Sequence, residues 1–83
     1  MILVICEIKP CHKTTSPFAK VWVDTDEFTE AKFRALENLA LKGIEVLSVT
    51  EAVVTDKSDY FPPCTSLDTF ALAENEGIAV LFS

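Results

Sequence analysis

The sequence predicts an α+β fold, a two-layer α/β sandwich whose elements follow the order ββαβαβ. Apolar runs stand near both ends of the chain, over residues 2–6 and 78–82, and neither alternates with polar residues. Continuous runs of this length that are rich in β-branched residues are typical of strands covered on both faces. Two further segments, over residues 27–42 and 66–76, repeat apolar residues with helical spacing.

A polar loop separates the first two predicted strands. The first strand spans residues 2–9 and ends at Pro10, because proline has no N–H group to continue a sheet ladder. A loop rich in Lys, Thr, Ser and Pro then leads to the second strand at residues 18–23, which does alternate. Its two faces carry Ala19, Val21 and Val23 on one side and Phe18, Lys20 and Trp22 on the other.

Glycines bound the two predicted helices. A helix over residues 27–42 ends at Gly43, and a shorter helix over residues 66–76 ends at Gly77. The valine-rich segment between them, residues 44–55, is either one strand or two strands with a bulge. The first helix is expected to bury an apolar arc formed by Phe28, Ala31, Ala35, Leu36, Leu39 and Ala40.

The connections predict a four-stranded mixed sheet with the strand order 2-1-4-3. The short first loop makes strands one and two antiparallel neighbours, and each helix is expected to return the chain so that strands two, three and four run the same way. The two fully apolar strands are placed in the centre, and the edge strands carry Lys20, Glu45 and Glu51, charges that discourage uncontrolled pairing. Both helices are expected on one face, in an arrangement of ferredoxin-like character.

An open sheet face is the reason to expect self-association. Two helices on one face leave the other face of this 83-residue chain with more apolar surface than monomers usually expose. With the alanine and valines of the second strand on the helix side, Phe18 and Trp22 fall on the open face as the expected interface residues. The alternative assignment turns Trp22 inward as an ordinary core residue. The expected partner is a second copy of the chain, with a dimer as the simplest homo-oligomer.

Length and charge narrow the function classes. The 83 residues suffice for a single domain, residues 1–83, and the hydrophobic fraction of 49% supports a folded globule. The net charge of −6 is uneven, with three basic side chains against one acidic over residues 1–22 and four against twelve over residues 23–83. An acidic body repels a phosphate backbone, so nucleic acid is not an expected partner.

Compartment and thiol state follow from three further observations. No segment approaches the ~20 apolar residues of a membrane helix, and the first residues lack a basic region, so we expect neither a membrane partner nor a signal peptide. The chain has three cysteines, an odd number at irregular spacing, which does not indicate a disulfide framework. The protein is therefore expected to be cytoplasmic, with reduced thiols.

Cys11, His12 and Cys64 form the one set of residues that suggests metal or thiol-redox chemistry, with Cys6 as a possible fourth member. The set lacks a Cys-x-x-Cys spacing, and the predicted topology places Cys11 and Cys64 at opposite ends of the sheet. We therefore expect no metal and no cofactor, and Cys6 is expected to be a small buried residue. A catalytic role would need Cys11 as a nucleophile with His12 as its base. No third group is evident to orient the imidazole, so no catalytic residue is assigned.

Two other segments have a structural explanation. An acid pair or a divalent-cation site is conceivable at the start of the first helix, but helix capping and the helix dipole account for the four carboxylates there. These are Asp24, Asp26, Glu27 and Glu30. The segment Tyr60-Phe61-Pro62-Pro63 is expected to fold over an open end of the thin core, with a docking strap for a partner as the alternative.

The sequence favours a small non-enzymatic module that self-associates through its open sheet face, in an accessory or regulatory role. The alternative is a small dimeric enzyme or ligand-binding protein whose pocket lies between the sheets of two subunits. His12, in the exposed first loop, and Lys32, inside the apolar arc of the first helix, are its possible ligand contacts. A second alternative is a metal or thiol-redox module that uses Cys11, His12 and Cys64.

Overall fold

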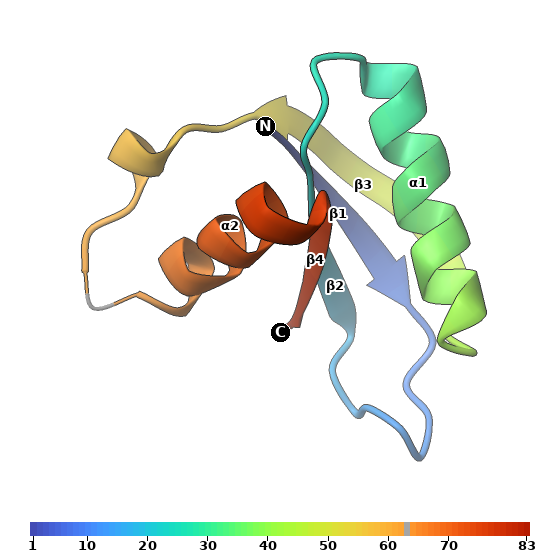
Figure 1. Cartoon of the computed structure of the whole chain (residues 1–83). Helices are drawn as coiled ribbons and strands as arrows, with labels where there is room; N and C mark the ends of the chain where they lie inside the picture. The colour runs from blue at the N-terminus through green and yellow to red at the C-terminus, as the bar shows by residue number, and fades with distance from the viewer. Residues whose placement is uncertain (63) are drawn as a thin grey trace.

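The structure, a computed structural model, describes residues 1–62 and 64–83, and its elements match the predicted ones in kind and order. The strands are β1 (Ile2–Ile8), β2 (Phe18–Val23), β3 (Val46–Val54) and β4 (Ile78–Phe82), and the helices are α1 (Phe28–Leu41) and α2 (Thr65–Glu76) (Figure 1). A 3₁₀ turn, η1 (Lys57–Asp59), lies between β3 and α2. The segment over residues 44–55 therefore forms one strand.

The four strands form one antiparallel sheet in the order β3-β1-β2-β4. β1 pairs with β2 and β3, whereas β4 pairs with β2 alone, so β3 and β4 are the edges. The α+β class with four strands and two helices is confirmed. The predicted mixed sheet with the order 2-1-4-3 is wrong, because all neighbouring strands are antiparallel and the apolar strand β4 lies at an edge.

The route of the chain after β3 explains this difference. β3 ends where the N–H of Thr55 donates to the carbonyl of Met1 at 2.9 Å. The connection then carries the chain away from the sheet, and α2 brings it back to the same end (Figure 1). There the N–H of Asp24 donates to the carbonyl of Gly77 at 2.9 Å. β4 consequently starts where β2 and β3 finish and runs antiparallel to both, instead of parallel as predicted.

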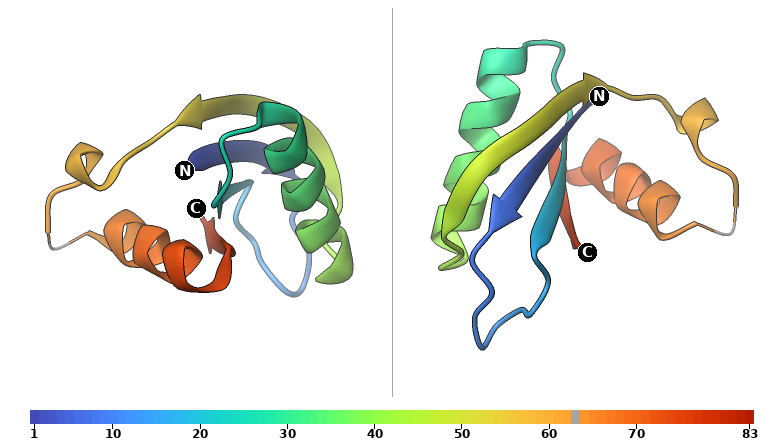
Figure 2. Two further views of the ribbon diagram at one scale, coloured as in Figure 1. Left: turned by 45° about the horizontal axis from the view of Figure 1, so that its top comes forward. Right: turned by 180° about the vertical axis from the view of Figure 1, so that it is seen from behind.

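The two helices cover opposite faces of the sheet (Figure 2). The core under α1 consists of Ile2, Val4, Cys6, Ile8, Ala19, Val21, Val23, Ala31, Ala35, Leu39 and Ile44. The core under α2 consists of Leu3, Trp22, Phe70, Ala73 and Ala79. The expected facing of the second strand is confirmed, since its alanine and valines lie under α1. The prediction that both helices share one face is wrong, and the ferredoxin-like character is not confirmed.

The second helix thus covers much of the face that was expected to be open. α1 packs on β1, β2 and β3, whereas α2 packs on β2 and β4. The remainder of the second face carries Glu7 on β1 and Glu51 on β3, both exposed, with the half-buried Lys20 on β2. A partly charged surface of this kind does not require a second copy to cover it, so the sheet face no longer supports self-association.

The edge strand β3 is irregular along its pairing with β1. Register shifts between Ile5 and Cys6 and between Glu7 and Ile8 interrupt the ladder. Bulges of this kind bend a strand and disturb the regular row of backbone groups on its outer side. Together with the exposed Glu51, they disfavour the addition of a further strand to β3, although Leu47, Val49 and Val54 of this strand are exposed as well.

α1 buries a narrower stripe than the sequence predicts. Ala31, Ala35 and Leu39 are buried, whereas Phe28 and Leu36 remain 42% and 37% exposed. The two alanines allow the helix axis to lie close to the sheet, so the stripe that fits against the strands is narrow. The wider predicted arc is therefore wrong at its margins.

Truncation of Phe70 tests the packing of α2 on the sheet. The Phe70 ring is 3% exposed within the core under α2, so Phe70→Ala should lower the free energy of unfolding by about 3–5 kcal/mol. Phe61 is 83% exposed, and the matched control Phe61→Ala should change that free energy by less than about 0.5 kcal/mol. Urea denaturation followed by circular dichroism measures both. Equal losses would contradict this position of α2.

Candidate functional site

The candidate site is the free edge of β4. Phe18 and Ser83 exchange both backbone hydrogen bonds, at 3.2 and 3.0 Å. In an antiparallel ladder, such pairs alternate with pairs whose N–H and carbonyl groups point away from each other. The register of β2 and β4 therefore turns the backbone groups of Ile78, Val80 and Phe82 away from β2 and toward the open edge.

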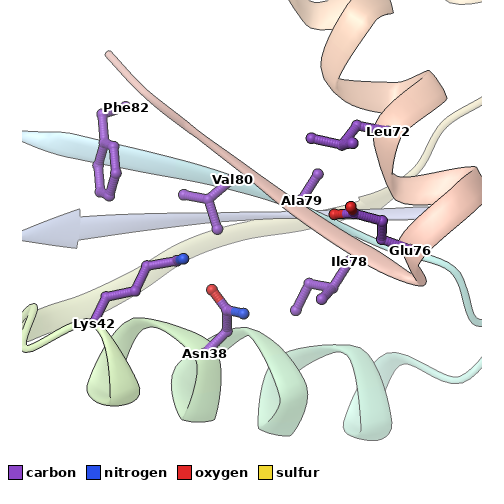
Figure 3. A pocket seen from close by; sticks show the side chains of 8 residues that line it. All are labelled: Asn38, Lys42, Leu72, Glu76, Ile78, Ala79, Val80 and Phe82. Atoms are coloured by element: carbon purple, nitrogen blue, oxygen red, sulfur yellow. The ribbon is translucent and has the colours of Figure 1, made fainter.

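The open edge lies in a groove between the two helices, which we call the β4 groove (Figure 3). The β4 groove has a volume of about 370 Å³. Its lining consists of Ile78, Ala79, Val80 and Phe82 of β4, Asn38 of α1, Lys42 after α1, and Leu72 and Glu76 of α2. The groove exists because α1 and α2 cover opposite faces of the sheet and flank its last strand.

β4 has none of the features that protect β3. Its residues are all apolar, and its register with β2 is continuous, without a bulge, a proline or a charge. Leu72 of α2, at the margin of the β4 groove, is 46% exposed. An apolar edge with a regular register is a template for pairing with another extended segment.

Polar side chains border the β4 groove. Figure 3 shows Lys42 at the Phe82 end of β4 and Glu76 near the beginning of the strand. The amide oxygen of Asn38 is buried and has no hydrogen-bond partner within the described residues. The β4 groove therefore combines free backbone groups and apolar walls with a cation and an anion at opposite ends.

Gly77 fixes the turn that leads into β4. It ends α2 with a φ of 87°, a left-handed conformation that glycine adopts without strain. The Arg34 guanidinium on α1 donates a hydrogen bond to the Gly77 carbonyl at 3.2 Å. A Cβ atom at position 77 would lie 3.1 Å from that guanidinium nitrogen. The start of β4 is thus held by both helices.

Trp22 holds α2 against its face of the sheet. The side chain is fully buried, and its Nε1–H donates a hydrogen bond to the Tyr60 hydroxyl oxygen at 3.1 Å. The Tyr60 ring lies 6.3 Å from the Trp22 ring and 6.1 Å from the Phe70 ring, measured between centroids. The connection after β3 and the second helix therefore share one aromatic cluster above β2.

The residues expected at an interface have different surroundings. Trp22 lies on the predicted face but is covered by its own chain, whereas Phe18 is 38% exposed. In the segment expected to fold over the core, Tyr60 is half-buried in the aromatic cluster and Phe61 is exposed. Pro63 lies outside the described residues.

The two possible ligand contacts, His12 and Lys32, are exposed and do not meet. His12 lies in the loop between β1 and β2, whose neighbouring Lys13 donates from Nζ to the Lys42 carbonyl at 2.9 Å. That loop therefore approaches the C-terminal end of α1. Lys32 lies about 15 Å away from Lys42 along the helix axis at a rise of about 1.5 Å per residue.

The three thiols are also separated by their surroundings. Cys6 is buried in the core under α1, Cys11 is partly exposed in the first loop, and Cys64 directly precedes α2. Burial raises the pKa of Cys6. The backbone N–H groups of Thr14 and Lys13, and then the Lys13 charge, lower the pKa of Cys11. Within residues 1–62 and 64–83, no three His, Cys, Asp or Glu side chains gather as metal ligands would.

The carboxylates before and within the first turn of α1 have a local structural role. The Thr25 hydroxyl accepts a hydrogen bond from the Glu27 N–H at 3.2 Å and donates to the Glu30 carboxylate at 3.0 Å. Among the residues that the structure describes, no side chain caps the helix directly, so the expected carboxylate cap is not formed. The threonine instead fixes the approach of the chain to the helix.

Sequence reasoning missed the β4 groove because it placed β4 in the centre of the sheet. The lack of charge and proline over residues 78–82 fits a central strand as well as an unprotected edge. The signal that distinguishes the two is the long connection over residues 55–64, which can carry the chain outward before α2 returns it.

Comparison of the chain with protein-family models, with curated proteins and with solved structures finds no match. In the part of the chain that the structure describes, no helix combines the length and the apolarity needed to cross a bilayer.

Removal of the Tyr60 hydroxyl tests the aromatic cluster. Tyr60→Phe keeps the ring but leaves the buried Trp22 N–H without its acceptor, so the free energy of unfolding should fall by about 1–3 kcal/mol. Urea denaturation monitored by tryptophan fluorescence measures the loss. A Tyr60→Phe variant as stable as the parent protein would show that this hydrogen bond does not hold the connection in place.

The lowered pKa of Cys11 predicts its reactivity. In a Cys6→Ala, Cys64→Ala variant, the alkylation rate should rise with pH around a lower midpoint in the folded chain than in the urea-unfolded chain. The sign follows because the loop N–H groups and Lys13 favour the thiolate, the reactive form, only when the loop is folded. Iodoacetamide labelling quantified by mass spectrometry gives both midpoints. Coincident midpoints would contradict this loop geometry.

Proposed function

We propose that this chain is a small non-enzymatic module that self-associates, in an accessory or regulatory role, through the edge of β4. The observation that carries the proposal is an apolar edge strand whose free N–H and carbonyl groups at Ile78, Val80 and Phe82 face outward. Pairing with a second strand supplies these groups with hydrogen bonds and removes the adjoining apolar surface from water.

The edge replaces the sheet face as the expected surface of association. Trp22 contributes indirectly, since it positions the helix that forms one wall of the β4 groove. Phe18, on the strand next to β4 and 38% exposed, lies where a partner at the edge would cover it at the margin. The small length of β4 leads us to expect a dissociation constant in the micromolar range, at the weak end of specific interfaces.

The polar groups of the β4 groove support a binding role over catalysis. A lysine, a glutamate and an asparagine border it, but none of them pairs a nucleophile with an oriented base, the arrangement that covalent catalysis requires. The sequence also offered an alternative, a ligand pocket between two subunits. The β4 groove would be that pocket, because it would lie where two copies meet.

Sedimentation velocity tests the proposal directly. The protein should shift from monomer to dimer between about 1 and 200 µM, the range that a small interface implies. A single monomeric species up to the highest concentration would contradict self-association.

Val80→Pro and Leu72→Glu locate the association at the edge. Val80→Pro removes an N–H that points to the open edge, so the ladder with β2 remains while the partner loses one hydrogen bond. Leu72→Glu places a charge on an exposed wall of the β4 groove without touching the strand. Both should raise the dimer dissociation constant at least tenfold, with unchanged circular dichroism. Ala79→Pro is the contrasting control, because its N–H bonds to β2 and its loss should destabilise the fold.

A further inference from the structure

We infer that two copies pair their β4 strands antiparallel about a two-fold axis at Val80, which joins the two sheets into one continuous sheet. The inference rests on the proposed self-association and specifies its geometry. The outward-facing residues are Ile78, Val80 and Phe82, and they are placed symmetrically about Val80. An antiparallel pairing in this register sets Val80 opposite its equivalent and Ile78 opposite Phe82 of the other copy.

This register uses every free backbone group of the edge. Each hydrogen-bonded pair of an antiparallel ladder exchanges two hydrogen bonds, so the three outward-facing residues form about six across the interface. A shift by one residue would place these groups opposite residues whose N–H and carbonyl groups already bond to β2. A shift by two residues would leave one outward-facing residue of each copy unpaired.

The side chains agree with the same two-fold axis. The axis is perpendicular to the sheet, so the α1 helices of both copies lie on one side and the α2 helices on the other. Ile78, Val80 and Phe82 pack on the α1 side in the single chain, and they would form one apolar row with their equivalents. On the α2 side, Ala79 would lie opposite Leu81, a small residue against a large one.

The charges that border the β4 groove are complementary under this symmetry. Lys42 lies at the Phe82 end of the strand, and Glu76 lies near Ile78 (Figure 3). Because the pairing sets Phe82 opposite Ile78 of the other copy, Lys42 of one copy comes to the same end of the interface as Glu76 of the other. Lys42 reaches that end from the α1 side of the joined sheet and Glu76 from the α2 side, so the opposite charges share an end without facing each other directly. A second copy of the chain thus supplies an opposite charge at both ends, which favours it over an uncharged peptide as the occupant.

The other edge of the sheet explains why the assembly stops at two copies. The interrupted register of β3 and the exposed Glu51 make that edge unsuitable for pairing. A dimer formed through β4 therefore has two β3 strands as its outer edges, where the interrupted register disfavours the addition of a third copy.

Cysteine cross-linking tests the register, in a Cys11→Ser, Cys64→Ser background. Residues facing each other in a hydrogen-bonded antiparallel pair have Cα atoms about 5.5 Å apart, within the span of about 4.4–6.8 Å that a disulfide accepts. Val80→Cys should therefore give a covalent dimer under mild oxidation. Phe82→Cys should not, because the two equivalent positions lie about 13 Å apart at roughly 3.3 Å per residue.

The outcomes separate this inference from the proposed function. A mixture of Ile78→Cys and Phe82→Cys chains should form the mixed disulfide, which shows that both variants are competent to react. A sedimenting dimer that is cross-linked by Phe82→Cys alone, or by none of these variants, overturns the register while self-association stands. A chain that stays monomeric in sedimentation overturns both, and a segment of a different protein then becomes the occupant of the edge.

A charge swap tests the symmetry without touching β4. Lys42→Glu and Glu76→Lys should each raise the dimer dissociation constant about twofold to threefold, the low end for exposed charges that share one end of an interface without direct contact. The double variant Lys42→Glu, Glu76→Lys should restore it, since each reversed charge again meets its opposite. Additive weakening in the double variant would show that the two side chains do not share an end of the interface.

Discussion

The position of α2 above Trp22 is the constraint on which the rest of this structure depends. An indole is too large to leave uncovered on a small sheet, and its N–H needs an acceptor. Tyr60, on the connection after β3, supplies the acceptor, and Phe70, on the second helix, helps to cover the ring. With α2 held on that face, Gly77 must turn the chain into β4 at the end of the sheet that β3 has just left, and β4 can pair only with the open side of β2.

The local features of the fold could be predicted from the sequence because they depend on neighbouring residues. Two glycines marked the helix ends, and a proline ended the first strand. The alternation of β2 correctly placed Val21 and Trp22 on opposite faces. The apolar run of β4 correctly indicated two covered faces, since Val80 packs under α1 and Ala79 under α2.

The strand order could not be derived in the same way. The pattern of apolar side chains indicates how many faces of a strand are covered. It does not indicate whether the backbone N–H and carbonyl groups along both edges of the strand are hydrogen-bonded. β4 is apolar on both faces and nevertheless has one free edge. Side-chain periodicity therefore could not indicate the candidate site. The two residues proposed from the sequence as possible ligand contacts, His12 from its loop and Lys32 from the apolar arc of the first helix, are exposed on separate parts of the molecule.

The path between β3 and β4 divides the molecule into two unequal parts. The first part holds three strands and α1, and the second is a helix–strand hairpin, α2 with β4, joined to the first by one long connection. The hairpin is retained by the ladder to β2 and by the packing of Phe70 and Ala73 in one core cluster with Trp22, and neither needs that covalent link. The protein is consequently suited to fragment complementation, in which two separately made polypeptides reassemble and restore the buried indole as their own fluorescent reporter.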